Sequence, residues 1–421
     1  MRRSAGVYFT SYGLSLLGKG IASVVLPLLV LDRTGDVLAA GLLATASMAA
    51  SALTGLVSGL LVDRIDRRAV SVVSDLLAAA SMAALPVVDA LWGLDMAWFL
   101  ALAVVGAVIR VPGMTAQETL LPALARLGRS TPGRLDRLIS LRETVGNVLL
   151  LAGPGLGGLL IGLLGLSPAL LLATVTTSLL AAGTTLVLDP RAGHVPRRRP
   201  GPAGGAVRRA VADLTVGWRF LFRTPLLLGA TLVSAVLVAV LSSLQTTLMP
   251  AYFLGEDLPA LTGLTLSALA AGGIAGSALY VATIGRIGRR TWFVTGMIGT
   301  LGGFAAVGSL ASPWVVLGGA GLVGLTNAPA SAVLGVLTVE ATPDGMRGRV
   351  LGAQNTLMLA APAVTAAPLA AVAATAGLPA AGVVLAVLAA ATAIAALVAP
   401  AFRSLDATEP GQHLVTTGDL P

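Results

Sequence analysis

Two basic residues lie inside long apolar segments, where a charge is costly. Lys19 stands about 12 residues into one such segment, and Arg110 stands about 14 residues into another. At 1.5 Å per residue, both lie roughly 18–21 Å along a helix, near the middle of a bilayer. A charge there costs at least about 2.5–3.5 kcal/mol, so both should face a cavity for an anionic or polar neutral molecule. Alternatively, they hydrogen-bond to backbone carbonyls and brace the helices.

Other polar residues are candidates for the same cavity or for proton transfer. Gln245 and Asn327 are polar points in apolar segments of the second half, so we place them on the cavity wall. No carboxylate is expected at the depth of Lys19, because Asp75, Glu118 and Glu143 should lie within about two turns of the helix ends. Three residues are candidate proton carriers: Glu118, Glu143 and Lys19, a lysine that burial helps to deprotonate. The neighbours Arg142 and Glu143 could instead form an ion pair at the membrane surface.

The residue types exclude most enzyme chemistry. Cysteine is absent, and the two histidines, His194 and His413, stand in polar segments. Thiolate metal sites are therefore excluded, and the sequence contains no phosphate-binding loop or nucleophile triad. We expect no catalytic residue, metal or cofactor, and a membrane enzyme or signalling scaffold is a remote alternative.

The segments that carry these residues are long and apolar. Of the 421 residues, 56% are hydrophobic and 11% are charged, which leaves too little polar surface for a water-soluble globule. Long runs rich in Leu, Ala and Gly predict an all-α membrane protein. Twelve spans are expected at roughly 7–31, 37–62, 69–89, 96–117, 142–164, 167–188, 225–250, 260–284, 291–310, 314–339, 350–375 and 378–399.

Basic residues gather in every second connection between these spans. With the N-terminus inside, the cytoplasmic segments hold all 27 Lys and Arg residues except Lys19, Arg33 and Arg110. The Lys/Arg bias of short loops orients membrane proteins. We therefore expect a multi-pass protein of the cell inner membrane with both termini in the cytoplasm. The net charge of +8 follows from this bias, and we expect no nucleic-acid partner.

The chain divides into two halves of six spans. The expected units are a helix bundle at 1–188, a basic linker at 189–224, a second bundle at 225–400 and a cytoplasmic tail at 401–421. The linker is rich in Pro, Gly and Arg, and its residues 207–222 have the spacing of an amphipathic helix on the inner leaflet. The first apolar stretch is too long for a signal peptide and is taken as a span.

The two halves repeat. A shift of 222 positions places Arg64-Ile65-Asp66-Arg67-Arg68 on Arg286-Ile287-Gly288-Arg289-Arg290, between the second and third spans of each half. Because each half has six spans, both enter the membrane from the same side. The repeat therefore predicts two six-helix bundles related by a pseudo-two-fold axis along the membrane normal, around one central cavity.

The first copy of this loop resembles a known signature. The segment from Gly59 through Asp63 and Arg64 to Arg67 and Arg68 is similar to the loop motif of the major facilitator superfamily. Asp66 stands where the family usually has Gly, a replacement that is frequent in the drug-exporter-like branch. Segments similar to that branch are also found at Pro27-Leu28-Leu29-Val30-Leu31, Leu121-Pro122-Ala123-Leu124, Gly153-Pro154-Gly155-Leu156-Gly157-Gly158 and Arg347-Gly348-Arg349-Val350.

The resemblance implies a gate at this loop. Asp63 would accept hydrogen bonds from the N-terminus of the eleventh span, where the helix dipole favours a negative charge. Arg67 or Arg68 would pair with Glu118 or Asp75, and these contacts would latch the outward-facing state of a transporter. Alternatively, the arginines only satisfy the charge bias of inner loops.

The expected function is transport. The leading hypothesis is a monomeric, proton-coupled antiporter that exports a small organic molecule, such as a drug or metabolite, by alternating access. The alternative is proton-driven uptake of a small anionic nutrient, for which the two buried cations are suited. The expected partners are thus a small-molecule substrate, protons and the lipid bilayer.

Overall fold

The computed structural model describes residues 2–62, 65–127, 134–193, 215–283, 286–343 and 346–402. Twelve helices in these ranges are long and apolar enough to cross a membrane, which confirms the predicted number of spans. The first six spans are α1 (Arg2–Thr34), α2 (Val37–Val62), α3 (Arg67–Leu91), α4 (Met96–Leu127), α5 (Arg134–Leu164) and η1 with α6 (Pro168–Leu170 and Leu171–Leu186), followed by the short α7 (Pro190–Gly193).

The second half repeats this order with one broken helix. Its first span is formed by α9 (Pro225–Ser243), the π-helical η2 (Leu244–Leu248) and α10 (Met249–Gly255). The other five are α11 (Ala260–Ala282), α12 (Arg289–Ser309), α13 (Pro313–Glu340), α14 (Arg347–Ala376) and α15 (Leu378–Val398), with the short η4 (Pro400–Phe402) at the end.

Several helices continue past the apolar stretches that predict them. α4 ends at Leu127 and α5 begins at Arg134, about two to three turns beyond the expected limits, because the flanking Arg, Glu and Leu residues favour a helix. At the other ends the turns are tight. Gly35 and Gly165 follow α1 and α5 with φ of 62° and 74°, a conformation that glycine adopts without steric cost.

The predicted linker helix is described only at its end. Residues 215–223 are helical, and Leu221 is fully buried in a cluster with Leu227 and Val350. Trp218 packs at the edge of this cluster and stacks on Phe222 with a ring separation of 5.7 Å. The apolar side of this segment therefore lies against the second half of the protein.

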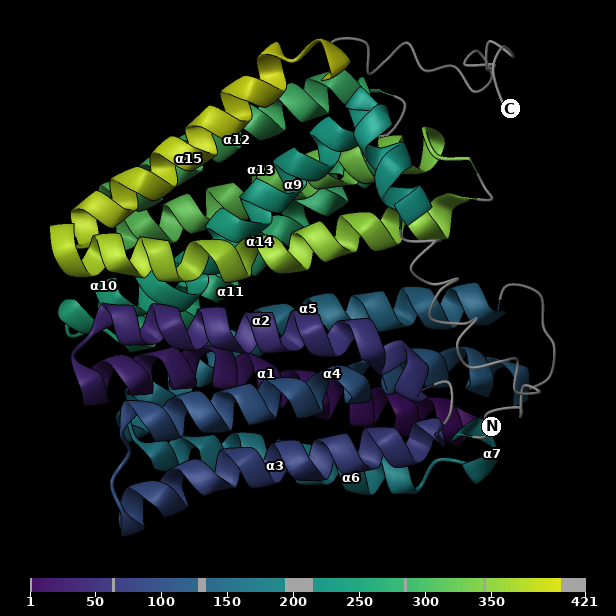
Figure 1. The fold of residues 1–421 in the computed structure, drawn as a ribbon, viewed down its shortest axis with the longest axis vertical. Helices are drawn as coiled ribbons and strands as arrows, with labels where there is room; N and C mark the ends of the chain where they lie inside the picture. The colour runs from purple at the N-terminus through teal and green to yellow at the C-terminus, as the bar shows by residue number, and fades with distance from the viewer. Residues whose placement is uncertain are drawn as a thin grey trace.

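The helices form two bundles, which Figure 1 shows one above the other. In the first bundle, α1 packs on α5 and α6, α2 packs on α4, and α3 packs on α4 and α6. In the second, α9 packs on α14 and α15, α11 packs on α13, and α12 packs on α13 and α15. Each pair in the first bundle thus has its counterpart in the second, as the predicted two-fold relation requires.

Two helix pairs make the most extensive contacts between the bundles, α2 with α14 and α5 with α11. They are equivalent under the same two-fold relation. Large apolar side chains such as Leu163, Val187 and Trp314 are exposed on the outside, whereas Val24, Leu28 and others on α1 are fully buried. The apolar surface belongs to a protein whose solvent is lipid, so the chain is a multi-pass membrane protein.

Candidate functional site

A large cavity lies between the two bundles. Its volume is about 730 Å³, within the range of small-molecule sites in proteins. Lys19 is the one charged residue among the described residues of its wall. The other polar members are Ser23, Thr144, Gln245, Ser277 and Asn327, and the remainder are apolar residues or glycines from α1, α5, α9, α11 and α13.

The helix break of the second half lies at this wall. Gln245 belongs to η2, a π-helical segment between α9 and α10. A single π-helical turn inside an α-helix is rare and is often found at functional sites. It changes the helical register, so the residues before and after it face different neighbours. The cavity is thus lined by a polar side chain at a place where the helix is irregular.

The bundles are in close contact on one side of the cavity. α1 begins on one face of the membrane region, here called the N-terminal face, and ends on the far face. Near the far face, a Cβ atom added to Gly41 would lie 2.1 Å from Cβ of Ala370, and one added to Gly158 would lie 3.1 Å from Cα of Gly263. These contacts join α2 to α14 and α5 to α11, so they close the far side.

The cavity wall continues toward the other side. Thr144 lies on α5 near the N-terminal face, and Ser277 lies near the end of α11 on that face. Ser267 Oγ donates a hydrogen bond to the carbonyl of Leu151 at 2.7 Å and adds to the contact between α5 and α11. The cavity therefore lies on the N-terminal side of a seal between the two bundles.

A second, much smaller pocket lies within the first bundle. Its volume is about 20 Å³, and Lys19, Asp75 and Arg110 share it. α3 and α4 approach closely here, because a Cβ atom on Gly113 would lie 2.5 Å from Cβ of Ser74. The expectation that no carboxylate reaches Lys19 is therefore wrong. The long side chains of Lys19 and Arg110 border the same pocket as Asp75.

Asp75 is held by neutral hydrogen-bond donors. Its side chain is buried, with an exposed fraction of 7%. Ser15 Oγ donates to Oδ1 at 3.2 Å, and Gln117 Nε2 donates to Oδ2 at 3.5 Å. Lys19 and Arg110 make no hydrogen bond or salt bridge with another residue in the described part of the chain. Arg110 was placed on the cavity wall from the sequence, but it belongs to this small pocket.

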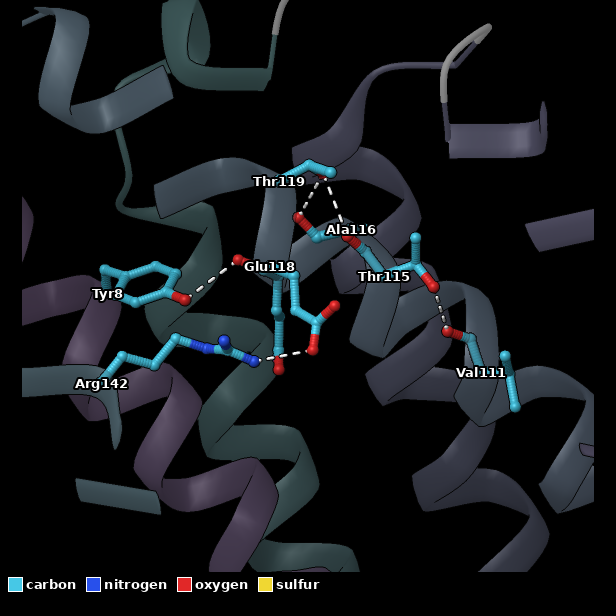
Figure 2. Close-up of polar contacts among 8 residues, drawn as sticks. Tyr8, Val111, Thr115, Ala116, Glu118, Thr119 and Arg142 are labelled. Atoms are coloured by element: carbon cyan, nitrogen blue, oxygen red, sulfur yellow. Dashed lines mark hydrogen bonds and ion pairs between the residues drawn. The ribbon is translucent and has the colours of Figure 1, made fainter. Parts of the chain in front are cut away.

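A third cluster lies closer to the N-terminal face. Figure 2 shows Tyr8, Glu118 and Arg142 pointing toward one another from three helices, α1, α4 and α5. Arg142 forms a salt bridge to Glu118 at 2.8 Å, and its guanidinium lies 5.2 Å from the ring centre of Tyr12. Tyr8 is fully buried and donates a hydrogen bond to the backbone carbonyl of Gln117 at 3.0 Å.

This cluster adds an ion pair to the predicted ones. Glu118 pairs with Arg142, whereas the pairing of Arg142 with its neighbour Glu143 stays a prediction. The side chain of Glu143 lies outside the described residues. Gln117 connects the third cluster with the small pocket, because its backbone binds Tyr8 and its side chain binds Asp75.

The loop after α2 is described in part. Asp63 and Arg64 lie outside the described residues, and Gly59 lies in α2. Asp66 caps α3 by accepting a hydrogen bond from the amide of Ala69 at 2.9 Å. Arg68 donates to the carbonyls of Thr185 and Leu186 at the C-terminus of α6, where a positive charge is favourable. Arg68 therefore does not pair with Glu118 or Asp75 in this state, and its pairing in the state with the N-terminal face closed stays a prediction.

The repeat of this loop holds a salt bridge that the sequence analysis missed. Arg289 binds Glu340 through two hydrogen bonds of 2.7 and 2.9 Å, which join α12 to α13. Arg289 and Glu340 are the residues that the shift of 222 positions places on Arg67 and Glu118. The repeat of the two halves could therefore have predicted this salt bridge from the sequence. In the described ranges, no group of three or more His, Cys, Asp or Glu residues is arranged to bind a metal.

Comparisons with known proteins agree with this architecture. The family model described as Major Facilitator Superfamily matches residues 8–282. The chain is 33% identical over 362 residues to a protein from Mycolicibacterium fortuitum named multidrug efflux pump Tap, covering 84% of this chain and 86% of that relative. A protein of the same name from Mycobacterium tuberculosis is 31% identical over 349 residues, covering 82% of this chain and 81% of the relative.

Solved structures show the same fold. The structure of a bacterial homologue of the iron transporter ferroportin, in an inward-facing state, has a TM-score of 0.73 at 16% identity and covers 97% of this chain and 100% of that one. A POT family transporter in complex with 5-aminolevulinic acid has a TM-score of 0.73 at 12% identity and covers 95% and 97%. At these identities, the likeness concerns the fold alone.

Proposed function

The chain belongs to the major facilitator superfamily, and from this premise we propose that it is a proton-coupled exporter of small organic molecules. The observation that supports this proposal most directly is the cavity of about 730 Å³ between the two bundles, which lies on one side of a tight seal. A transporter that works by alternating access needs such a site at the interface of its halves. The relatives named multidrug efflux pump favour export as the direction.

The charge distribution supports the orientation. Among the described residues, all Lys and Arg except Lys19, Arg33 and Arg110 lie toward the N-terminal face, so by the positive-inside rule this face is cytoplasmic. Both termini then lie in the cytoplasm, and the cavity is on the cytoplasmic side of the seal. A molecule to be exported enters from that side, so this is the loading state of the exporter.

The cavity wall suggests the class of substrate. Most of its residues are apolar, and a few polar side chains are placed among them, as in sites for drug-sized molecules. Lys19 adds a single positive charge, which favours polar neutral or anionic groups over an organic cation. The same charge supports the alternative function, proton-driven uptake of a small anion.

The gate remains part of the proposal. Asp63 would bind the N-terminus of the eleventh span, which is α14, when the N-terminal face closes. In the described state the cavity lies on that side, and the seal is on the far face. Asp63→Asn should therefore slow transport while the protein still inserts, and undiminished turnover at normal expression would remove the latch.

Everted membrane vesicles test the direction of transport. Vesicles with an acid interior and this protein should accumulate a neutral or weakly charged fluorescent dye, and a protonophore should abolish the accumulation. Vesicles without the protein are the control. Accumulation of carboxyfluorescein by right-side-out vesicles under an inward proton gradient, with no uptake of dyes by everted vesicles, would support anion uptake and overturn export.

A further inference from the structure

Lys19 borders two cavities in the described part of the chain. Among the described residues, it is the one that belongs to both the wall of the large cavity and the wall of the small pocket. A lysine ammonium is a compact charge on a flexible stem of four carbons. Lys19 makes no hydrogen bond or salt bridge with another described residue, so no such contact holds its ammonium in one place. An ammonium that can approach either cavity can make the electrostatics of the small pocket depend on what occupies the large cavity.

Asp75 is the carboxylate that this charge reaches. It is buried, and two cations act on it, Lys19 from α1 and Arg110 from α4. The wall contributed by α6 offers hydroxyl groups alone, Thr174 and Ser178. The small pocket, at about 20 Å³, is large enough for about one water molecule, the usual carrier of a proton to a buried acid.

The other candidate in the described residues is less suited. Glu118 is half exposed, at 53%, and is already neutralised by its salt bridge to Arg142. Glu118 is also not among the described residues that line the large cavity. Asp75, in contrast, is separated from the large cavity by Lys19.

We propose that Asp75 takes up and releases the transported proton, and that Lys19 couples this step to the occupancy of the large cavity. The inference rests on the proton coupling proposed above and names the residues that perform it. The chemistry is proton transfer alone: the carboxylic acid of Asp75 gives its proton to water in the small pocket, and the carboxylate remains beside two cations.

The coupling has a direction that depends on the substrate. A neutral or cationic molecule in the large cavity favours movement of the Lys19 ammonium toward Asp75, which stabilises the carboxylate and releases the proton. Substrate and proton then exclude each other, as an antiporter requires. An anion attracts the ammonium away from Asp75 and favours proton uptake, so an anion and a proton would move together.

Infrared spectroscopy of the purified protein in lipid nanodiscs tests the role of Asp75. Acidification should produce the C=O band of a buried carboxylic acid. The band should shift when aspartate carries a ¹³C-labelled carboxyl group, a test that needs no mutation. It should vanish in Asp75→Asn and persist in the matched control Glu118→Gln. A band that persists in Asp75→Asn, or no band that titrates, would overturn the proposal.

The role of Lys19 has its own measurement. Lys19→Met removes a cation near Asp75, so the midpoint of the band should move to higher pH by about one unit or more. Lys19→Arg keeps the charge and should move it less. An unchanged midpoint in Lys19→Met would show that Lys19 does not act on Asp75.

A transport measurement separates this inference from the proposed function. If the vesicles accumulate a dye, Asp75→Asn should abolish accumulation driven by the gradient and preserve exchange of dye between the two sides without a gradient. Loss of both activities in a correctly inserted variant would contradict a role restricted to the proton. If wild-type vesicles accumulate no dye, the exporter proposal fails, whereas the infrared result still decides whether Asp75 is the titrating group.

Discussion

Gly41 is the residue whose enlargement should open the far-face seal. In Gly41→Ala, the new Cβ would lie 2.1 Å from Cβ of Ala370 and 3.0 Å from the carbonyl oxygen of Ala366. Carbon atoms in contact are about 3.5–4.0 Å apart, so α2 and α14 must separate by about 1.5 Å. Neither atom of α14 can move by a change of rotamer, because one is a Cβ and the other belongs to the backbone.

The expected effect is a change in the population of the two transport states. Overpacking of this kind costs about 1–3 kcal/mol. The cost applies to the state with the seal closed, since opening the far face separates α2 from α14. A difference of about 1–3 kcal/mol raises the population of the open-seal state roughly 5- to 150-fold while that state remains the minor one.

Cysteine labelling measures this population. The chain has no cysteine, so Ser23→Cys provides a unique thiol on the cavity wall. The rate of labelling by a membrane-impermeant maleimide added to the far face should rise at least about fivefold in Gly41→Ala. Gly55→Ala, on the same helix α2, is the matched control, because its new Cβ would be 4.0 Å from the nearest side chain, Val111. Equal labelling rates in the two variants would refute the reasoning.

Three further predictions concern stability. Tyr8→Phe removes the hydrogen bond to Gln117 and should lower the free energy of unfolding by about 0.5–1.5 kcal/mol, measured by chemical denaturation; an unchanged value would contradict it. Thr231→Val removes the hydroxyl that accepts a 2.6 Å hydrogen bond from the buried amide of Gln354, and it should lower the free energy of unfolding by about 1–3 kcal/mol. The double variant Thr231→Val with Gln354→Leu should recover most of this loss, because it leaves no buried amide without an acceptor. Arg289→Ala should lower the free energy of unfolding by no more than about 1 kcal/mol, because the side chains of Arg289 and Glu340 are both more than a third exposed. It should not change labelling of Ser23→Cys, since α12 and α13 belong to one bundle, and a changed rate would contradict the assignment of this pair to stability.

The number and order of the spans could be predicted because lipid imposes a simple pattern. A span needs about 20 apolar residues, and each connection shows its side by its basic residues. The repeat of Arg64–Arg68 at Arg286–Arg290 predicted the relation between the halves. Helix ends were less predictable, since α4 and α5 continue as helices into polar sequence that hydropathy does not count.

The candidate site was predicted only in part, because depth along a helix does not determine which side chains meet. Lys19, Gln245 and Asn327 line one cavity, as expected from their isolated positions in apolar helices. Asp75 was expected within about two turns of the helix end and not at the depth of Lys19, yet it shares a pocket with Lys19. This shared pocket depends on the close packing of α3 and α4 at Gly113 and on the length of the lysine side chain, and residue spacing predicts neither.

The unequal division of charge between the bundles has a consequence for how such a protein changes over generations. Lys19, Asp75 and Arg110 all belong to the first bundle, whereas the wall from α9, α11 and α13 carries no charge among its described residues. Substitutions on that neutral wall can alter the shape and polarity of the cavity without disturbing a buried ionised group. New substrates are therefore most readily acquired through mutations in the second bundle, whereas mutations in the first bundle would alter its buried charges.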